Sequence, residues 1–204
     1  MRWPCFRKSG GKDGDSGFNL GSSRQYHPAE GAQLERLTTL GRKQAMLAGK
    51  RLRDEKVDRI VHSTMPRAAE TAGIIRAQLG FQKALETTDT LRECVPGFPK
   101  AARKKYGYND IKKLTSDKAQ ADRAFKKYFR LPKKDTVEVL VCHGNIIRYL
   151  VCKTLRIDLE AWLKMDIQQC GITVIHLKSK GINRHQLISH NDVGHIKKRD
   201  RTFL

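Results

Sequence analysis

Apolar residues recur at regular spacing from residue 34 onward, and the first regular segment predicts a helix. Thr38 or Thr39 can cap its start, because either hydroxyl accepts a hydrogen bond from a free N–H of the first turn. Its apolar residues fall on one helical face: Leu40, Leu47, Ala48 and Leu52. A short apolar run at residues 59–62 then predicts a buried strand.

A second helix is predicted directly after this strand. Pro66 suits a first-turn position, and Ser63 or Thr64 can cap the helix. Its apolar face comprises Ala68, Ala72, Ile75 and Leu79. Residues 34–79 are therefore predicted to form a helix, a strand and a helix in that order.

The second half of the chain repeats this pattern. Val137, Val139 and Val141 alternate with other residues and predict a strand that ends in residues 143–145. A helix follows, with one apolar face formed by Ile147, Leu150, Val151 and Leu155. Residues 172–177 and 182–188 flank a polar turn and predict an antiparallel hairpin. The fold class is α/β, with three layers: a mostly parallel central sheet, flanking helices and the hairpin at an edge.

The chain is strongly basic, and the charge is concentrated in one segment. It has 204 residues, which suits a single domain, and its 41 Lys and Arg against 21 Asp and Glu give a net charge of +20. Residues 98–134 hold thirteen Lys and Arg against three Asp, a net charge of +10. Such charge predicts an acidic protein or an anionic membrane surface as partner.

Aromatic residues lie among these cations, a pattern found in proteins that bind single-stranded nucleic acid. Here, however, Phe125, Tyr128 and Phe129 share helical spacing with Ala121 and Ala124, which predicts a core-facing stripe. Nucleic acid is therefore not the expected partner.

The five cysteines lack the short paired spacings of a zinc site or a secreted scaffold. We expect a reducing compartment and neither a metal nor another cofactor. No apolar run reaches the length of a membrane span, and no clear targeting signal stands at the N-terminus.

Two loops combine residues that suit phosphate chemistry. Residues 63–67 link the first strand to a helix and end in Arg67, whose guanidinium can hold a phosphate through two hydrogen bonds. Residues 142–145 link the second strand to the helix that follows it, and the ring of His143 can donate a hydrogen bond to a phosphoryl oxygen. Glu93, in the segment Leu91-Arg92-Glu93-Cys94, can act as a general acid near a phosphate. The sequence therefore predicts a phosphate site at the carboxyl ends of parallel strands.

Four ordered segments resemble the blocks of the histidine phosphatase (phosphoglycerate mutase-like) superfamily: residues 37–45, 60–71, 91–93 and 141–149. Within that superfamily they are most similar to mitochondrial serine/threonine-protein phosphatases. The resemblance covers residues 24–195, which we take as the domain. Residues 1–23 are rich in Gly and Ser and are expected to be a disordered lead or a misread coding segment, and residues 196–204 are a basic tail.

The resemblance implies that a phosphomonoester is hydrolysed in two steps. A histidine takes the phosphoryl group, a glutamate protonates the leaving oxygen, and water then attacks the phosphohistidine. Carried over to this chain, Glu93 is the acid and His143 the second, charge-stabilising histidine. Arg67 is the second arginine, and Asn145 also binds the phosphate.

The nucleophile is where the sequence departs from the family pattern. A hydrophobic strand ending in Arg-His is expected just before residues 25–27, and Ser22-Ser23 stand there instead. Only residues 18–20 resemble such a strand, so the first strand is in doubt. His27 is the nearest histidine, but near-attack geometry tolerates a misplacement of only about 1 Å.

Three explanations stay open: an inactive relative that binds phosphoproteins or other partners, a misread first coding segment, or relocated chemistry. The main functional prediction is a serine/threonine phosphoprotein phosphatase whose activity is impaired. The alternative is a pseudophosphatase that serves as a basic scaffold for acidic or phosphorylated partners. The resemblance also implies the mitochondrial outer membrane as location, and self-association is left open.

Overall fold

The computed structural model describes residues 2–4, 36–98, 100–104, 107–131, 135–178 and 184–202. Its α-helices are α1 (Thr39–Arg51), α2 (Pro66–Leu79), α3 (Lys100–Arg103), α4 (Ile111–Tyr128) and α5 (Gly144–Leu155). Its strands are β1 (Arg2–Pro4), β2 (Arg59–Ser63), β3 (Glu86–Thr88), β4 (Glu138–Val141), β5 (Ile172–Leu177) and β6 (His185–Asp192). Short 3-10 turns are η2 (Asp89–Leu91), η3 (Leu159–Lys164) and η4 (Lys198–Asp200). Among these described parts, no helix is long and apolar enough to cross a membrane.

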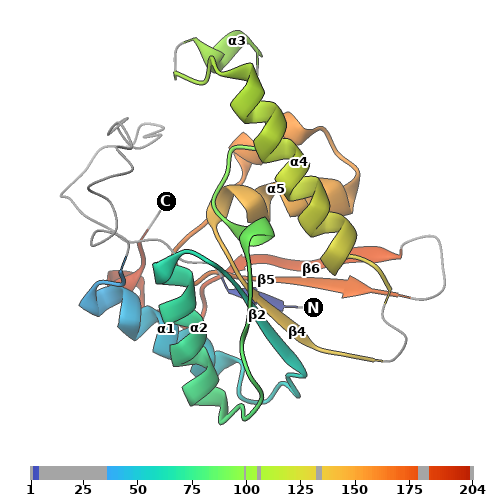
Figure 1. Cartoon of the computed structure of the whole chain (residues 1–204). Coiled ribbons are helices and arrows are strands. Elements are labelled where there is room, and N and C mark those ends of the chain that lie inside the picture. Colours follow the sequence, from blue (N-terminus) through green and yellow to red (C-terminus); the bar gives the residue numbers. More distant parts are fainter. Residues whose placement is uncertain are drawn as a thin grey trace.

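The six strands form one sheet in the order β3-β2-β4-β1-β5-β6 (Figure 1). Strands β3, β2, β4 and β1 run parallel to one another. Strand β5 runs antiparallel to both β1 and β6, so β5 and β6 form a hairpin at one edge. The predicted fold class is confirmed, including the mostly parallel sheet and the antiparallel edge.

The doubtful first strand is the main correction to the sequence analysis. No strand was expected in residues 1–23, yet β1 occupies the slot between β4 and β5. Arg2 pairs with Val139 of β4 in parallel, and Trp3 pairs with Thr173 of β5 in antiparallel register. The three-residue segment has no periodicity to reveal it, and its pairing depends on the two open strand edges beside it. Residues 18–20 lie outside the described residues.

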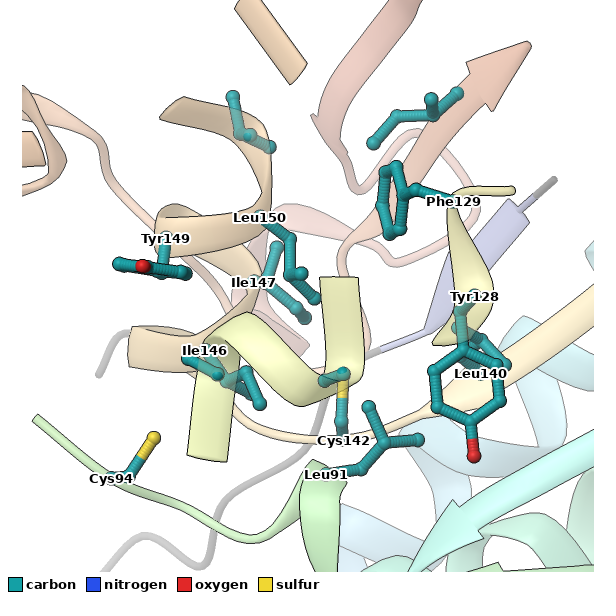
Figure 2. Close-up of a cluster of buried hydrophobic side chains, with 14 of the residues drawn as sticks. Leu91, Cys94, Tyr128, Phe129, Leu140, Cys142, Ile146, Ile147, Tyr149 and Leu150 are labelled. Atoms are coloured by element: carbon teal, nitrogen blue, oxygen red, sulfur yellow. The ribbon is translucent and has the colours of Figure 1, made fainter. Parts of the chain in front are cut away.

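The sheet is buried on both faces, which produces three layers. Ile60, Val139 and Val141 face α1 and α2 and join one apolar cluster with the residues of those helices. Val61, Leu140 and Cys142 face the opposite way and join a second cluster under α4 and α5 (Figures 1 and 2). Alternate residues of one strand thus enter different cores, as expected of a parallel strand covered by helices.

The predictions for the first two helices hold, with one correction at the start of α2. Thr38 caps α1 by accepting a hydrogen bond from the backbone N–H of Gly41 at 3.0 Å, and Pro66 lies in the first turn of α2. The residue that caps α2 is Met65, without a side-chain hydrogen bond, rather than Ser63 or Thr64. The Ser63 hydroxyl contacts the ring of His143 instead.

The later elements differ from prediction at their ends. Leu155 was expected on the apolar face of α5 but is 43% exposed at the last position of that helix. The second hairpin strand begins at His185 and runs to Asp192, beyond the predicted end at residue 188. Its residues are half-buried or exposed without strict alternation, so the spacing of its apolar residues alone does not locate it.

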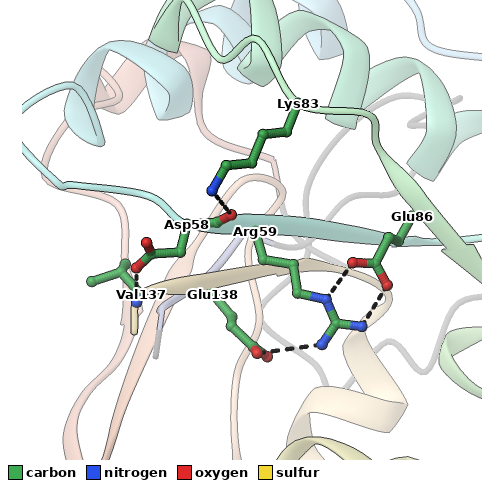
Figure 3. Close-up of polar contacts among 6 residues, drawn as sticks. All are labelled: Asp58, Arg59, Lys83, Glu86, Val137 and Glu138. Carbon is green, nitrogen blue, oxygen red and sulfur yellow. Dashed lines mark hydrogen bonds and ion pairs between the residues drawn. The ribbon is translucent and has the colours of Figure 1, made fainter. Parts of the chain in front are cut away.

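A charged cluster joins three strands at the edge opposite the predicted phosphate site (Figure 3). The Arg59 guanidinium bonds both carboxylate oxygens of Glu86 on β3 and lies 3.3 Å from a carboxylate oxygen of Glu138 on β4. Nearby, Asp58 accepts a hydrogen bond from the backbone N–H of Val137 at 2.9 Å. Because β2, β3 and β4 each contribute a side chain or backbone group, the cluster stabilises their register.

Candidate active site

The site lies where β2 and β4 end side by side. His62 pairs with Val141, so the residues that follow both strands emerge at one edge of the sheet. Ser63 ends β2, and His143 directly precedes α5; both are fully buried. The His143 ring Nε2 and the Ser63 hydroxyl are 2.9 Å apart, although 80 positions separate the two residues.

Ser63 links this histidine to the loop that leads into α2. Its hydroxyl oxygen accepts a hydrogen bond from the backbone N–H of Met65 at 3.2 Å, while its other contact is His143. We predicted Ser63 only as a helix cap. A signal for its second role is present in the sequence, because it is a small polar residue that follows a buried strand directly.

Arg67 lies in the first turn of α2, two residues after Met65, whose backbone N–H bonds the Ser63 hydroxyl. Its side chain reaches the Met65 sulfur at 3.5 Å, and the residue is only 8% exposed. A buried guanidinium remains charged, because its pKa lies far above neutrality, and it presents several N–H donors in a fixed plane. Its place in the first turn of a helix makes this side chain suitable for holding an anion.

Glu93 approaches the same edge from a third segment, after β3 and η2. One of its carboxylate oxygens accepts a hydrogen bond from the backbone N–H of Asn145 at 3.2 Å. Asn145 is the second residue of α5, so the carboxylate lies at the positive end of that helix. The Asn145 side-chain oxygen in turn accepts a hydrogen bond from Arg148 at 3.2 Å.

Helix α4 holds the backbone on either side of Glu93. Gln120 donates a hydrogen bond to the Arg92 carbonyl at 2.9 Å, and Asp117 accepts one from the backbone N–H of Val95 at 2.8 Å. The Arg92 side chain extends across the site edge and donates to the Thr64 hydroxyl at 3.0 Å. Arg92, Gln120 and Asp117 were not predicted as contributors, because their contacts depend on how α4 packs.

The structure therefore brings together four of the predicted residues: Arg67, Glu93, His143 and Asn145. The expected nucleophile position, Ser23, lies outside the described residues, as does His27. Along the sequence, the residue that follows β1 is Cys5.

Two buried cysteines lie in the segments that form this edge. Burial raises the pKa of the Cys142 thiol, which directly precedes His143, far above its usual range. Burial likewise raises the pKa of the Cys94 thiol, and the neighbouring Glu93 carboxylate adds to the shift. Both thiols pack in the apolar cluster under α4 and α5.

The class of protein is thus an α/β domain in which side chains suited to phosphate chemistry gather at the carboxyl ends of parallel strands. The family model described as "Histidine phosphatase superfamily (branch 1)" matches residues 28–190. The chain belongs to the histidine phosphatase superfamily.

The curated relatives carry a more specific name. Serine/threonine-protein phosphatase Pgam5, mitochondrial, from Caenorhabditis briggsae is 36% identical over 178 residues, which cover 84% of this chain and 61% of that protein. The Homo sapiens protein of the same name is 36% identical over 165 residues, covering 77% of this chain and 56% of its own length. The chain therefore spans about three fifths of the length of these relatives.

Solved structures agree with the fold. Phosphoglycerate mutase from Plasmodium falciparum is 32% identical, covers 74% of this chain and 83% of its own, and superposes with a TM-score of 0.54. Bacillus stearothermophilus YhfR has a TM-score of 0.64 at 22% identity, covering 82% of this chain and 94% of its own. At that identity, YhfR supports the fold alone.

Proposed function

We propose that this chain binds phosphoserine and phosphothreonine groups of proteins at the edge formed by Ser63, Arg67, Glu93 and His143. The observation that carries the proposal is the contact between His143 and Ser63, because the same Ser63 hydroxyl also accepts the backbone N–H of Met65 at the start of α2. The names of the Pgam5 relatives support protein serine and threonine residues as the source of the phosphate.

The chemistry assigned to these residues follows from their properties. Arg67 and His143 would hold the phosphoryl oxygens, since a guanidinium and an imidazole both donate hydrogen bonds to developing negative charge. Glu93 would give its proton to the serine or threonine oxygen as the bond from that oxygen to phosphorus breaks. In the family's two-step reaction, a nucleophilic nitrogen forms the new bond to phosphorus, and water later breaks it.

Hydrolysis in this chain is proposed to be impaired. The positions to which the family resemblance assigns the arginine and the nucleophilic histidine hold Ser22 and Ser23. The same observation favours the second candidate function, a pseudophosphatase that binds phosphorylated or acidic partners without turnover. A mitochondrial location, at the outer membrane, is proposed from the names of the relatives and from the family resemblance.

Turnover and binding are measured separately to test these proposals. We expect purified protein to hydrolyse an aryl phosphate slowly or not at all, and to bind a phosphoserine peptide in calorimetry. Arg67→Ala should lose that binding, whereas Arg76→Ala, an exposed cation on the same helix, should retain it.

Two outcomes would contradict the account. Brisk hydrolysis that is abolished in His143→Gln but unchanged in His27→Ala would show that the nucleophile is present elsewhere in the chain. Equal phosphopeptide affinity in wild type and Arg67→Ala would remove the proposed binding site. Thermal unfolding of each variant separates loss of the site from loss of the fold.

A further inference from the structure

Both acidic residues of helix α4 form ion pairs with neighbouring lysines. Asp117 is only 7% exposed and lies 3.1 Å from the Lys113 ammonium group. Asp122 lies 2.8 Å from Lys118 and 3.1 Å from Lys153 of α5. The two carboxylates of the helix are thus already neutralised by neighbouring cations.

The opposite face of α4 is cationic. The buried residues of the helix are Leu114, Asp117, Ala121, Ala124 and Tyr128. On the far side, Lys112, Arg123 and Lys126 are all exposed. None of the three forms an ion pair with an acidic side chain in the parts of the chain that the structure describes. Ser116 and Ala119 lie between them, so small side chains leave the row of cations accessible.

The dimensions of this row suit an extended peptide. Lys112 and Lys126 are fourteen positions apart, which corresponds to about 21 Å along a helix. An extended chain covers that distance with about six or seven residues. A short run of Asp and Glu in a partner protein therefore matches both the length and the sign of this face, which we call the α4 outer face.

Other polyanions fit this face less well. Among the aromatic residues at the end of α4, Tyr128 and Phe129 are buried, and half-buried Phe125 stacks on Phe129 with ring centroids 4.5 Å apart. They are therefore not available to stack on the bases of single-stranded nucleic acid. Ser116 and Ala119 offer no large apolar side chain for insertion into a bilayer. A second copy of this chain is disfavoured because each carries a net charge of +20.

The α4 outer face belongs to the same helix that supports the candidate active site. Gln120 and Asp117 hold the backbone of residues 92 and 95, which flank Glu93. A partner bound at both places gains affinity, because the first contact raises the local concentration of the second.

We propose that the α4 outer face docks an acidic segment of the phosphoprotein whose phosphorylated residue enters the candidate active site. Entry of the phosphorylated residue into the candidate active site rests on the proposed function. The docking of the acidic segment is independent of the catalytic residues and is measured on its own.

Three labelled peptides test this docking by fluorescence anisotropy: an unphosphorylated peptide with seven Glu or Asp, a phosphoserine peptide without acidic residues, and one that combines both. The α4 variant carries Lys112→Glu, Arg123→Glu and Lys126→Glu. The matched control carries Lys50→Glu, Lys56→Glu and Lys197→Glu, three other exposed lysines, and changes the net charge equally.

We expect the α4 variant to weaken binding of the acidic and combined peptides by at least about tenfold, and the control to leave them within about twofold. Binding of the phosphoserine peptide should be unchanged in the α4 variant. Higher salt should weaken the acidic peptide most, because exposed charges are screened. Thermal unfolding checks that both variants remain folded.

Equal weakening by the two variants would overturn the docking surface, since net charge alone would then explain binding. Tighter binding of single-stranded DNA or phosphatidylserine vesicles, lost in the α4 variant, would also overturn it. A phosphoserine peptide that fails to bind the wild type would overturn the proposed function while the acidic peptide still binds. The two failures are therefore distinguishable.

Discussion

The carboxylate of Glu93 accepts a hydrogen bond from the backbone N–H of Asn145, although the two residues are 52 positions apart in the sequence. This contact joins the segment after η2 to the first turn of α5, directly beside His143. It places the Glu93 carboxylate at the start of α5, one turn or less from His143 along the chain. The position of Glu93 thus depends on both α5 and the helix α4 that holds its backbone.

Replacing Ser63 by alanine should weaken phosphate binding. The Ser63 hydroxyl contacts the buried His143 ring at 2.9 Å, and its loss removes a hydrogen bond worth about 0.5–1.5 kcal/mol. We expect the affinity for a phosphoserine peptide without acidic residues to fall by about three- to tenfold in calorimetry. Ser116→Ala, on the exposed face of α4, is the control and should bind as the wild type does. Unchanged affinity in Ser63→Ala would contradict the role of this contact.

Asp117→Ala should destabilise the protein and weaken the site together. The buried Asp117 carboxylate accepts the Val95 N–H at 2.8 Å, so its removal leaves a buried donor without its partner. The expected cost is about 1–3 kcal/mol in the free energy of unfolding, measured by urea denaturation. The exposed Asp135→Ala is the matched control, with an expected change within about 0.5 kcal/mol. Similar values for the two variants would show that the Asp117 contact contributes little.

Two glycines in neighbouring helices should respond to alanine in opposite directions. A Cβ on Gly49 of α1 would lie 2.6 Å from the Gln78 Cβ and 3.3 Å from the Ile75 backbone, so Gly49→Ala should cost about 1–3 kcal/mol. A Cβ on Gly73 of α2 meets no atom within 4 Å, so Gly73→Ala should stabilise by about 0.4–1 kcal/mol. Thermal unfolding measures both. A stabilising Gly49→Ala would show that α1 and α2 do not pack this closely.

The Arg59 cluster should make stability depend on pH in the acidic range. The hydrogen bond from Arg59 holds the pKa of Glu86 below its ordinary value, against the opposing effect of burial. Because the folded protein then binds this proton less readily than the unfolded chain, the stabilisation is present at neutral pH and is lost as the pH falls through the lowered pKa.

Glu86→Gln tests this dependence in urea titrations between pH 7 and pH 3. The Glu86 side chain is about half exposed, so we expect the variant to be less stable by only about 0.5–1 kcal/mol at pH 7. The difference from wild type should shrink toward pH 3. Glu160→Gln, an exposed residue of η3, should show no such trend. A constant difference for Glu86→Gln would rule out the ion pair as its cause.

Much of the fold could be predicted from the spacing of apolar residues. The strand at 59–62, the helix that begins at Pro66 and the strand before His143 all occur as predicted, because each buries a continuous apolar stripe. Strand β1 could not be predicted. Arg2, Trp3 and Pro4 show no strand pattern, and they pair because β4 and β5 present open edges on both sides.

The candidate site, like the fold, could be predicted only in part from the sequence. Arg67 and His143 could be selected from the sequence because each follows a predicted buried strand, and Glu93 because its carboxyl group suits acid catalysis. The role of Ser63 beside His143, and the hold of Gln120 and Asp117 on the segment around Glu93, could not. Those contacts join residues between 22 and 80 positions apart, and no local pattern encodes them.

By itself, the sequence determined the α/β class, the order of most elements, the chemical types at the site and the large positive charge. Local spacing suffices for these features, because periodicity and composition are properties of neighbouring residues. Tertiary structure alone decided that β1 fills the slot in the sheet, that Asp122 of α4 also pairs with Lys153 of α5, and that Lys112, Arg123 and Lys126 remain on the outer face of α4. The physical reason is that open strand edges and charge pairs are completed only by segments that folding brings together from distant parts of the chain.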